Sequence, residues 1–139
     1  MFCICTSLSG QEIAASEWKF ESQRKEIAPE WHVDSNITYK GQPTLLIMGG
    51  GKDYANGHWY SITRVEPGEY FRFESNFITS NVEELNRNIL ARIIWQDASG
   101  KNLGYPEYPA TFPDKTNDGW NYIKQLYRVP DNVRTAKIE

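Results

Sequence analysis

The stretch from Glu69 to Thr79 reads EYFRFESNFIT, and its strict alternation decides the class of fold that this sequence predicts. Phenylalanines occupy Phe71, Phe73 and Phe77, so they would share one face of an extended strand. One apolar and one polar face are typical of a strand in an antiparallel sandwich. The residues predicted to point the other way are Tyr70, Arg72, Glu74 and Asn76.

Similar strand signals recur along the chain, and turn residues such as Pro67-Gly68 separate them. Only the stretch 81–90 carries apolar residues at helical spacing. Because turns rather than crossover helices join the strands, we predict an all-β fold, an antiparallel two-sheet jelly-roll β-sandwich. The other predicted strands lie within 44–48, 57–65, 89–96, 120–129 and 133–139.

The composition bounds the possible functions. A chain of 139 residues with 40% hydrophobic residues and a net charge of −3 fits one globular domain. It contains no run of basic residues, so we expect no nucleic-acid partner. The aromatic content of 14% is high, and it favours a β-rich chain.

The two ends of the sequence suggest a cleaved leader at the N-terminus and a longer parent protein at the C-terminus. Residues 1–16 are predicted to be a signal-peptide remnant or flexible leader, with possible cleavage after Gly10, and 17–139 the β-sandwich domain. The first ten residues are too few for a membrane span, and they look like the tail of a secretory signal whose basic start is missing. A secreted or periplasmic location is therefore expected. The strand signal at 133–139 runs to the last residue, which suggests a piece of something longer.

The sequence offers little catalytic chemistry. Cys3 and Cys5 are too close in the chain for a disulfide framework or a zinc site. His32 and His58 belong to no metalloprotease motif, and no nucleophile-elbow motif is present. Gly49 to Asp53 lacks the spacing of a phosphate loop, so we read it as an inter-strand loop. We therefore predict a non-catalytic chain.

Acidic residues near turns have two interpretations. Asp34, Asp53 and Asp97 can cap backbone N–H groups, or their oxygens can serve as ligands for a structural calcium ion. No spaced calcium motif is present, and no other cofactor is expected.

The aromatic residues point to sugar binding. Sugar rings stack on Trp and Tyr, and their hydroxyls pair with planar polar side chains. Each aromatic residue can equally be core, and each polar residue can be a solvated sheet face. Trp95 is expected in the core, while the aromatic candidates are Trp59, Tyr60, Tyr105, Tyr108, Trp120 and Tyr122. The full set of predicted ligand-binding residues is Arg72, Glu74, Asn76, Arg92, Tyr105, Tyr108 and Trp120.

The order of several short motifs resembles the galactose-binding-domain-like jelly roll of bacterial carbohydrate-binding modules. The motifs span about 26–139 and include Gly57-x-Trp59, Pro67-Gly68-x-Tyr70, Arg92-x-x-Trp95 and Gly119-Trp120. The segment 22–29, with Asp34 and the 81–87 region, is similar to N-terminal accessory domains of bacterial carbon–nitrogen hydrolases. The resemblance implies a glycan-binding sandwich, often with calcium, beside a catalytic domain in cis that would lie beyond Glu139.

Three functions are compatible with the sequence. The first is a non-catalytic carbohydrate-binding module that takes a poly- or oligosaccharide and belongs to a larger exported bacterial hydrolase. The second is a structural or protein-interaction sandwich without a sugar ligand. The third is a jelly-roll enzyme, which would need a metal set or a Tyr–Lys or Tyr–Arg pair in a cleft.

Overall fold

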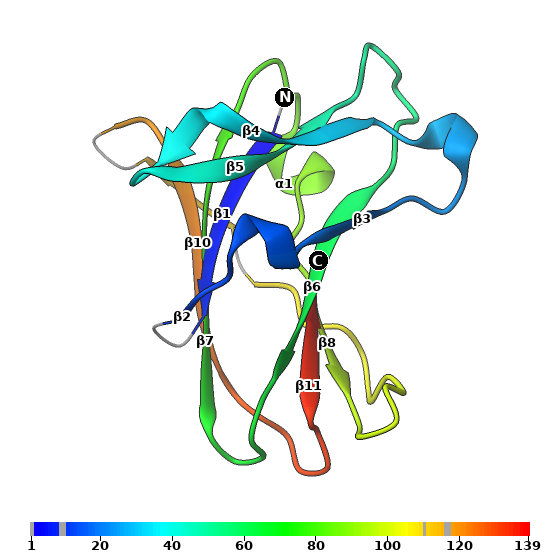
Figure 1. Ribbon diagram of the computed structural model, residues 1–139, viewed down its shortest axis with the longest axis vertical. Coiled ribbons are helices and arrows are strands. Elements are labelled where there is room, and N and C mark those ends of the chain that lie inside the picture. The colour runs from blue at the N-terminus through cyan, green and yellow to red at the C-terminus, as the bar shows by residue number, and fades with distance from the viewer. Residues whose placement is uncertain (1, 9–10, 110, 116–117) are drawn as a thin grey trace.

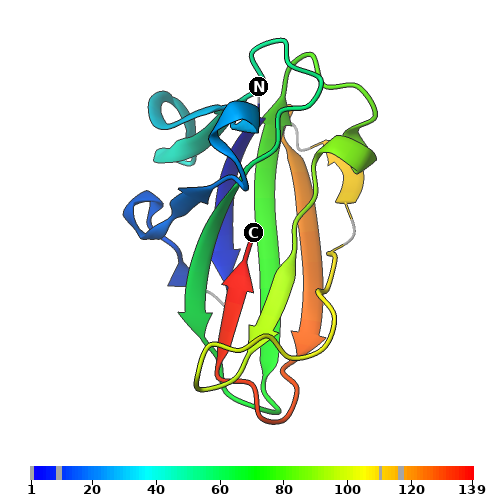
Figure 2. The same cartoon turned by 90° about the vertical axis from the view of Figure 1, so that its right-hand side faces the viewer.

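Two antiparallel sheets face each other in the computed structural model, which describes residues 2–8, 11–109, 111–115 and 118–139 (Figures 1 and 2). Every strand pairing is antiparallel, and the helices are single turns. The predicted all-β, antiparallel class is therefore confirmed.

The larger sheet has the strand order β4-β5-β1-β7-β10-β9, and β2 pairs with β1 at its margin. The hairpin of β4 and β5 forms one edge, and β7 lies in the interior of the sheet (Figure 1). The strands are β1 (Phe2–Leu8), β2 (Gln11–Glu12), β4 (Glu30–Tyr39), β5 (Gln42–Met48), β7 (Tyr70–Thr79), β9 (Thr111–Lys115) and β10 (Asn121–Arg128).

The smaller sheet has the order β3-β6-β11-β8. Figure 2 shows this sheet in front of the larger one, with β11 in its middle. Its strands are β3 (Lys19–Glu21), β6 (His58–Arg64), β8 (Ile93–Gln96) and β11 (Thr135–Ile138).

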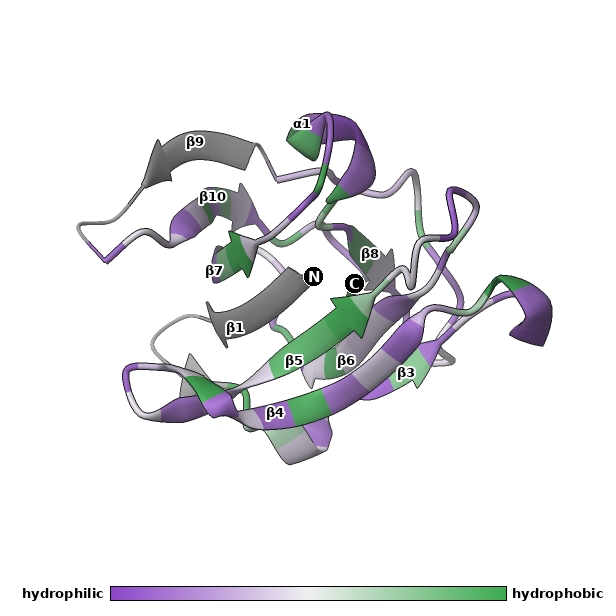
Figure 3. Cartoon of the chain, turned by 90° about the horizontal axis from the view of Figure 1, so that it is seen from above, coloured by the Kyte–Doolittle hydropathy of each residue, from purple (hydrophilic) through white to green (hydrophobic). Residues whose placement is uncertain are grey.

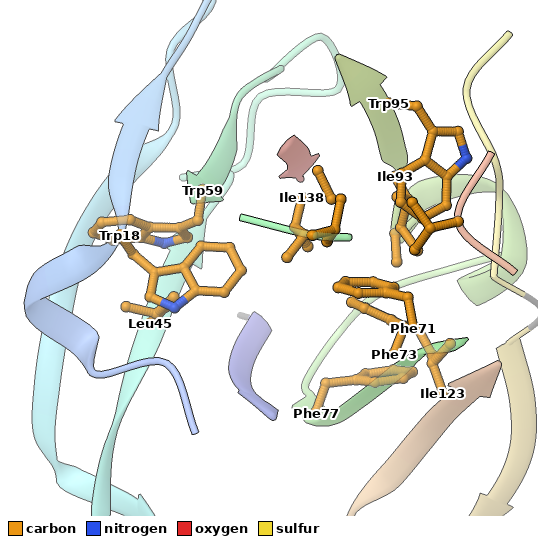
Figure 4. Packing of buried hydrophobic residues seen from close by; sticks show 14 of the residues in the cluster. Trp18, Leu45, Trp59, Phe71, Phe73, Phe77, Ile93, Trp95, Ile123 and Ile138 are labelled. Atoms are coloured by element: carbon orange, nitrogen blue, oxygen red, sulfur yellow. The ribbon is translucent and has the colours of Figure 1, made fainter. Parts of the chain in front are cut away.

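The core lies between the sheets and follows from the alternation of β7. Phe71, Phe73, Ser75 and Phe77 are buried, and Tyr70, Arg72, Glu74 and Asn76 are more exposed, as the sequence predicted. Figure 4 shows these rings facing Ile93 and Ile138 of the smaller sheet. Apolar area removed from water contributes about 25 cal/mol per Å², so this packing is the main source of stability.

Among the described residues, the helices are short elements of about one turn. They are α1 (Leu85–Asn88), η1 (Ala15–Glu17) and η2 (Lys25–Ile27). α1 falls within the stretch with helical spacing, while the rest of 81–90 is irregular.

Several elements depart from the sequence prediction. β8 begins at Ile93 rather than at 89, and β4, which carries few apolar residues, was not predicted. Residues 2–8 form β1 between β5 and β7, and the predicted cleavage point at Gly10 lies outside the described residues. Seen from above, apolar colour covers the second half of β5, whereas polar and apolar colours alternate along β4 (Figure 3).

Candidate functional site

The outward-facing residues of β7 form the centre of a polar surface on the larger sheet. Glu74 lies between Arg72 and Lys124, whose Nζ is 3.2 Å from Glu74 Oε1, while Arg72 Nε is 4.0 Å from the same oxygen. The side chains of Arg72, Glu74 and Lys124 are 57%, 35% and 59% exposed. Such partly exposed ion pairs contribute little to stability, so these groups can exchange partners with a ligand at low cost.

The register of β10 against β7 extends this surface. Tyr122 pairs with Asn76, Lys124 with Glu74, and Leu126 with Arg72. Directly paired residues share a face of the sheet and lie close together. Asn76 and Tyr122 are half-buried, and within the described part of the chain the Asn76 amide makes no side-chain hydrogen bond. An aromatic ring therefore lies beside an amide and three charged groups.

One end of this surface is closed by an apolar cluster. Trp120 is only 6% exposed, and its ring centroid lies 4.9 Å from that of Tyr39. Leu46 is the other buried member, and Ile78 packs against the cluster from β7. Trp120 therefore lies next to the polar surface, but its side chain is buried in the apolar cluster and offers little area to a ligand. We call the surface formed by Arg72, Glu74, Asn76, Tyr122 and Lys124 the ladder face.

The remaining predicted residues, Arg92, Tyr105 and Tyr108, lie beside the smaller sheet. Segment 101–109 runs beside β8, where Glu107 and Ile93 exchange two backbone hydrogen bonds of 2.9 Å. Tyr105 is 93% exposed and Tyr108 is 55% exposed. Burial, with a smaller effect of the Glu107 carboxylate, raises the pKa of nearby Tyr127 to about 12.

Arg92 belongs to an ion cluster on the smaller sheet, so it lies apart from Arg72, which is on β7 of the larger sheet. Its guanidinium contacts the Glu139 carboxylate, which also accepts a bond from Lys137 Nζ at 2.7 Å. Glu139 is 4% exposed. The segment 80–92 carries the chain from β7 in the larger sheet to β8 in the smaller sheet. No local sequence pattern predicts this change of sheet.

The ion cluster shifts three pKa values. Burial opposes the charge of Glu139, yet the Lys137 hydrogen bond and the charges of His58, Arg92 and Lys137 keep its pKa below the ordinary value. Burial also opposes the charge of Lys137, but Glu139 and Glu21 raise its pKa. Burial lowers the pKa of His58, and Lys137 and Arg92 add to this against the opposing carboxylates.

A cavity of about 690 Å³ opens at the same end of the molecule. Glu139, His58 and Trp59 line it, together with the loops 49–57 and 81–90. The predicted inter-strand loop at Gly49 to Asp53 forms part of its rim.

Asp34 and Asp97 each accept hydrogen bonds from nearby backbone N–H groups. Asp34 Oδ1 accepts a bond from Asn36 N at 2.7 Å, which lowers the pKa of Asp34 despite the opposing effect of burial. Asp97 accepts from the Ser99 hydroxyl and from the Ser99 and Lys101 amides, which lowers its pKa. Among the described residues, no three acidic, histidine or cysteine side chains gather as a metal site. The calcium site remains a prediction.

The two histidines lie on different sheets. His32 is on β4 with Asp34 at 3.8 Å, and His58 is on β6 with Glu139 at 3.4 Å.

Within the described ranges, none of the helices has the length and apolarity needed to cross a bilayer.

The sequence predicted part of the ladder face and missed the rest. Arg72, Glu74 and Asn76 follow from alternation within one strand, and Tyr122 was an aromatic candidate. Lys124 was missed, although it alternates with Tyr122 in β10, because pairing between distant strands cannot be read from one chain segment. His58, Lys137 and Glu139 carried no recognisable motif.

The chain matches no protein-family model, no curated protein and no solved structure.

Proposed function

We propose that this chain is a non-catalytic glycan-binding module with a jelly-roll β-sandwich fold, and that the ladder face is its binding surface. One observation carries the proposal. The register of β7 and β10 places an aromatic ring, an amide, a carboxylate and two cations on one open face. Membership of a larger exported bacterial hydrolase is part of the proposal and rests on the resemblance of the sequence.

The chemistry of the ladder face suits a sugar. A sugar hydroxyl both donates and accepts, so it can accept from Lys124 or Arg72 while donating to Glu74. The Asn76 amide offers a donor and an acceptor beside the Tyr122 ring, on which the CH face of a sugar can stack. Because the face is open rather than enclosed, we expect an extended chain to lie across the strands with a Kd in the micromolar to millimolar range, roughly −4 to −8 kcal/mol.

Affinity electrophoresis through gels that contain soluble polysaccharides tests this directly. Asn76→Ala and Tyr122→Ala should each abolish most of the retardation on the polysaccharide that binds the unaltered chain. The matched controls are Asn86→Ala, an exposed amide on α1, and Tyr105→Ala, an exposed ring in the segment beside β8. Both controls should be retarded like the unaltered chain. Loss of binding in Tyr105→Ala with retention in Tyr122→Ala would move the site to the smaller sheet and overturn the assignment.

A structural sandwich without a sugar ligand is the second candidate. It is favoured by the burial of Trp18, Trp59, Trp95 and Trp120, each at most 8% exposed. Absence of retardation on a broad panel of plant, algal, fungal and bacterial glycans would favour this candidate over the first.

A further inference from the structure

The outward positions of β7 and β10 continue beyond the five residues of the ladder face. The two strands pair in register as far as Tyr70 with Arg128. Because side chains alternate along a strand, outward positions recur every second residue, about 7 Å apart. Beyond Asn76 and Tyr122, the outward pairs are Glu74 with Lys124, Arg72 with Leu126, and Tyr70 with Arg128. We call these three pairs the cationic rungs.

Each of the three rungs contains one cation. The cations are Lys124, Arg72 and Arg128, and Glu74 is the single carboxylate among the six residues. Three cations against one carboxylate leave an excess of two positive charges. The whole chain carries a net charge of −3, so this excess is a local property of the surface. An excess of one sign on an open surface attracts ligands of the opposite sign.

The charge of Arg128 is available to a ligand. Its side chain is exposed, and no ion pair or hydrogen bond joins its guanidinium to another described residue. Glu66 and Glu69 lie in the turn before β7, yet neither forms an ion pair with Arg128. A Cβ built on Gly68 would lie 3.6 Å from Arg128 Nη2, so the guanidinium lies beside this turn at the end of the rungs.

The other two cations share Glu74 unequally. Lys124 Nζ is 3.2 Å from Glu74 Oε1, whereas Arg72 Nε is 4.0 Å from the same oxygen, which is beyond hydrogen-bond distance. A planar guanidinium can bind a carboxylate or another oxyanion through two parallel hydrogen bonds. An anionic group can therefore bind Arg72 while Lys124 keeps its contact with Glu74.

Two of the rungs also offer nonpolar surface. Leu126 is 52% exposed opposite Arg72, and Tyr70 is 69% exposed opposite Arg128. The CH face of a sugar can pack on such side chains. A cation and a nonpolar contact on the same rung suit a sugar that carries an acidic group, whereas a simple anion would leave the nonpolar contact unused.

We propose that the ligand of the ladder face and the cationic rungs is an acidic polysaccharide, whose carboxylate or sulfate groups bind these cations. The inference rests on the proposed glycan-binding function and names its ligand class. A chain that crosses β7 and β10 meets a cation at whichever rung it crosses, and an oblique chain meets two. Hydrogen bonds between charged groups are stronger than those to neutral hydroxyls, so the acidic groups add affinity.

Affinity electrophoresis with matched polymers tests the ligand class. Polygalacturonate should bind the unaltered chain about tenfold more tightly than its fully methyl-esterified form, which keeps the sugar rings without their charge. Carrageenan and its desulfated form make the same comparison for sulfate and so distinguish the two acidic groups. Poly-L-glutamate presents carboxylates without sugar rings and should bind more weakly than the preferred acidic polysaccharide. Each mobility is compared with that of the same protein in a gel without polymer.

Substitutions locate the binding on the rungs. Arg128→Gln and Lys124→Gln should each weaken binding to the acidic polysaccharide by about tenfold. The matched control is Arg64→Gln, which removes an exposed cation from β6 in the smaller sheet and should bind like the unaltered chain. Glu74→Gln removes the carboxylate that competes for Arg72 and Lys124, so it should strengthen binding to the acidic polysaccharide.

Three results would overturn the proposal. They are equal binding to the acidic and neutralised forms of each polysaccharide, equal binding to poly-L-glutamate, and equal losses in Arg64→Gln and Arg128→Gln. The last would show attraction by net charge alone. Retardation on neutral glycans only would overturn this inference and leave the proposed function standing, whereas absence of retardation on every glycan would overturn both.

Discussion

Gly57 is the position where one added methyl group should damage this fold most clearly. A Cβ built there would lie 2.5 Å from Phe20 Cζ and 3.0 Å from Pro29 Cδ. The Phe20 ring cannot retreat freely, because it stacks on Trp31 at a centroid distance of 4.9 Å and meets the edge of Trp59 at 5.7 Å. Gly57→Ala must therefore displace Phe20 and disturb this group of aromatic rings.

The magnitude follows from two opposing effects. Overpacking of an ordered site costs about 1–3 kcal/mol. Replacing glycine by alanine restricts the unfolded chain, which offsets about 0.4–1 kcal/mol. The net loss in free energy of unfolding is about 1–2 kcal/mol, which lowers the melting temperature of a chain of this size by about 3–6 °C.

The assay is thermal unfolding followed by circular dichroism, with Trp31 fluorescence as a local probe. Gly49→Ala is the matched control, because a Cβ there would meet only ordinary contacts, 3.8 Å from Lys52 O and 3.9 Å from Ala55 Cβ. The control should be neutral or slightly stabilising. If both variants melt together, or if the fluorescence of Gly57→Ala is unchanged, the close approach of Phe20 to Gly57 is wrong.

Three further results are expected. Because the folded-state pKa of His58 lies below its unfolded value of about 6.5, the unfolded chain binds the proton more readily, so the free energy of unfolding falls as the pH drops below about 6.5. His58→Gln should reduce the change in the free energy of unfolding, measured by urea unfolding, between pH 7 and pH 5. The same change with pH in the variant and the unaltered chain would contradict this. Trp31 is 50% exposed, so Trp31→Phe should remove most of the acrylamide-quenchable fluorescence, whereas strong residual quenching would show that buried tryptophans are accessible. Trp120→Ala should lower the free energy of unfolding, measured in urea, by about 3–5 kcal/mol, because Trp120 is buried. The matched control Leu126→Ala, at an exposed position of the adjoining strand, should change it by no more than about 0.5 kcal/mol. Equal effects of the two substitutions would refute the packing of Trp120.

Much of the fold was readable because alternation is a local property. The pattern of β7 follows from the two-residue period of a strand, and burial of its phenylalanines confirms it. β4 escaped prediction because Trp31 and Val33 sit at a sheet edge, where half-exposed residues give no clean pattern. Three of the five ladder-face residues could likewise be predicted, since Arg72, Glu74 and Asn76 share one strand face.

The sequence by itself determined the class of fold and which side of β7 faces the solvent, because side chains alternate whatever the strand pairs with. Only the tertiary structure decided that Lys124 and Tyr122 join that face, while Arg92 joins Glu139 on the other sheet. These contacts depend on which distant strands pair and in what register. Register is set by the summed burial of both sheets, and no single segment carries that information.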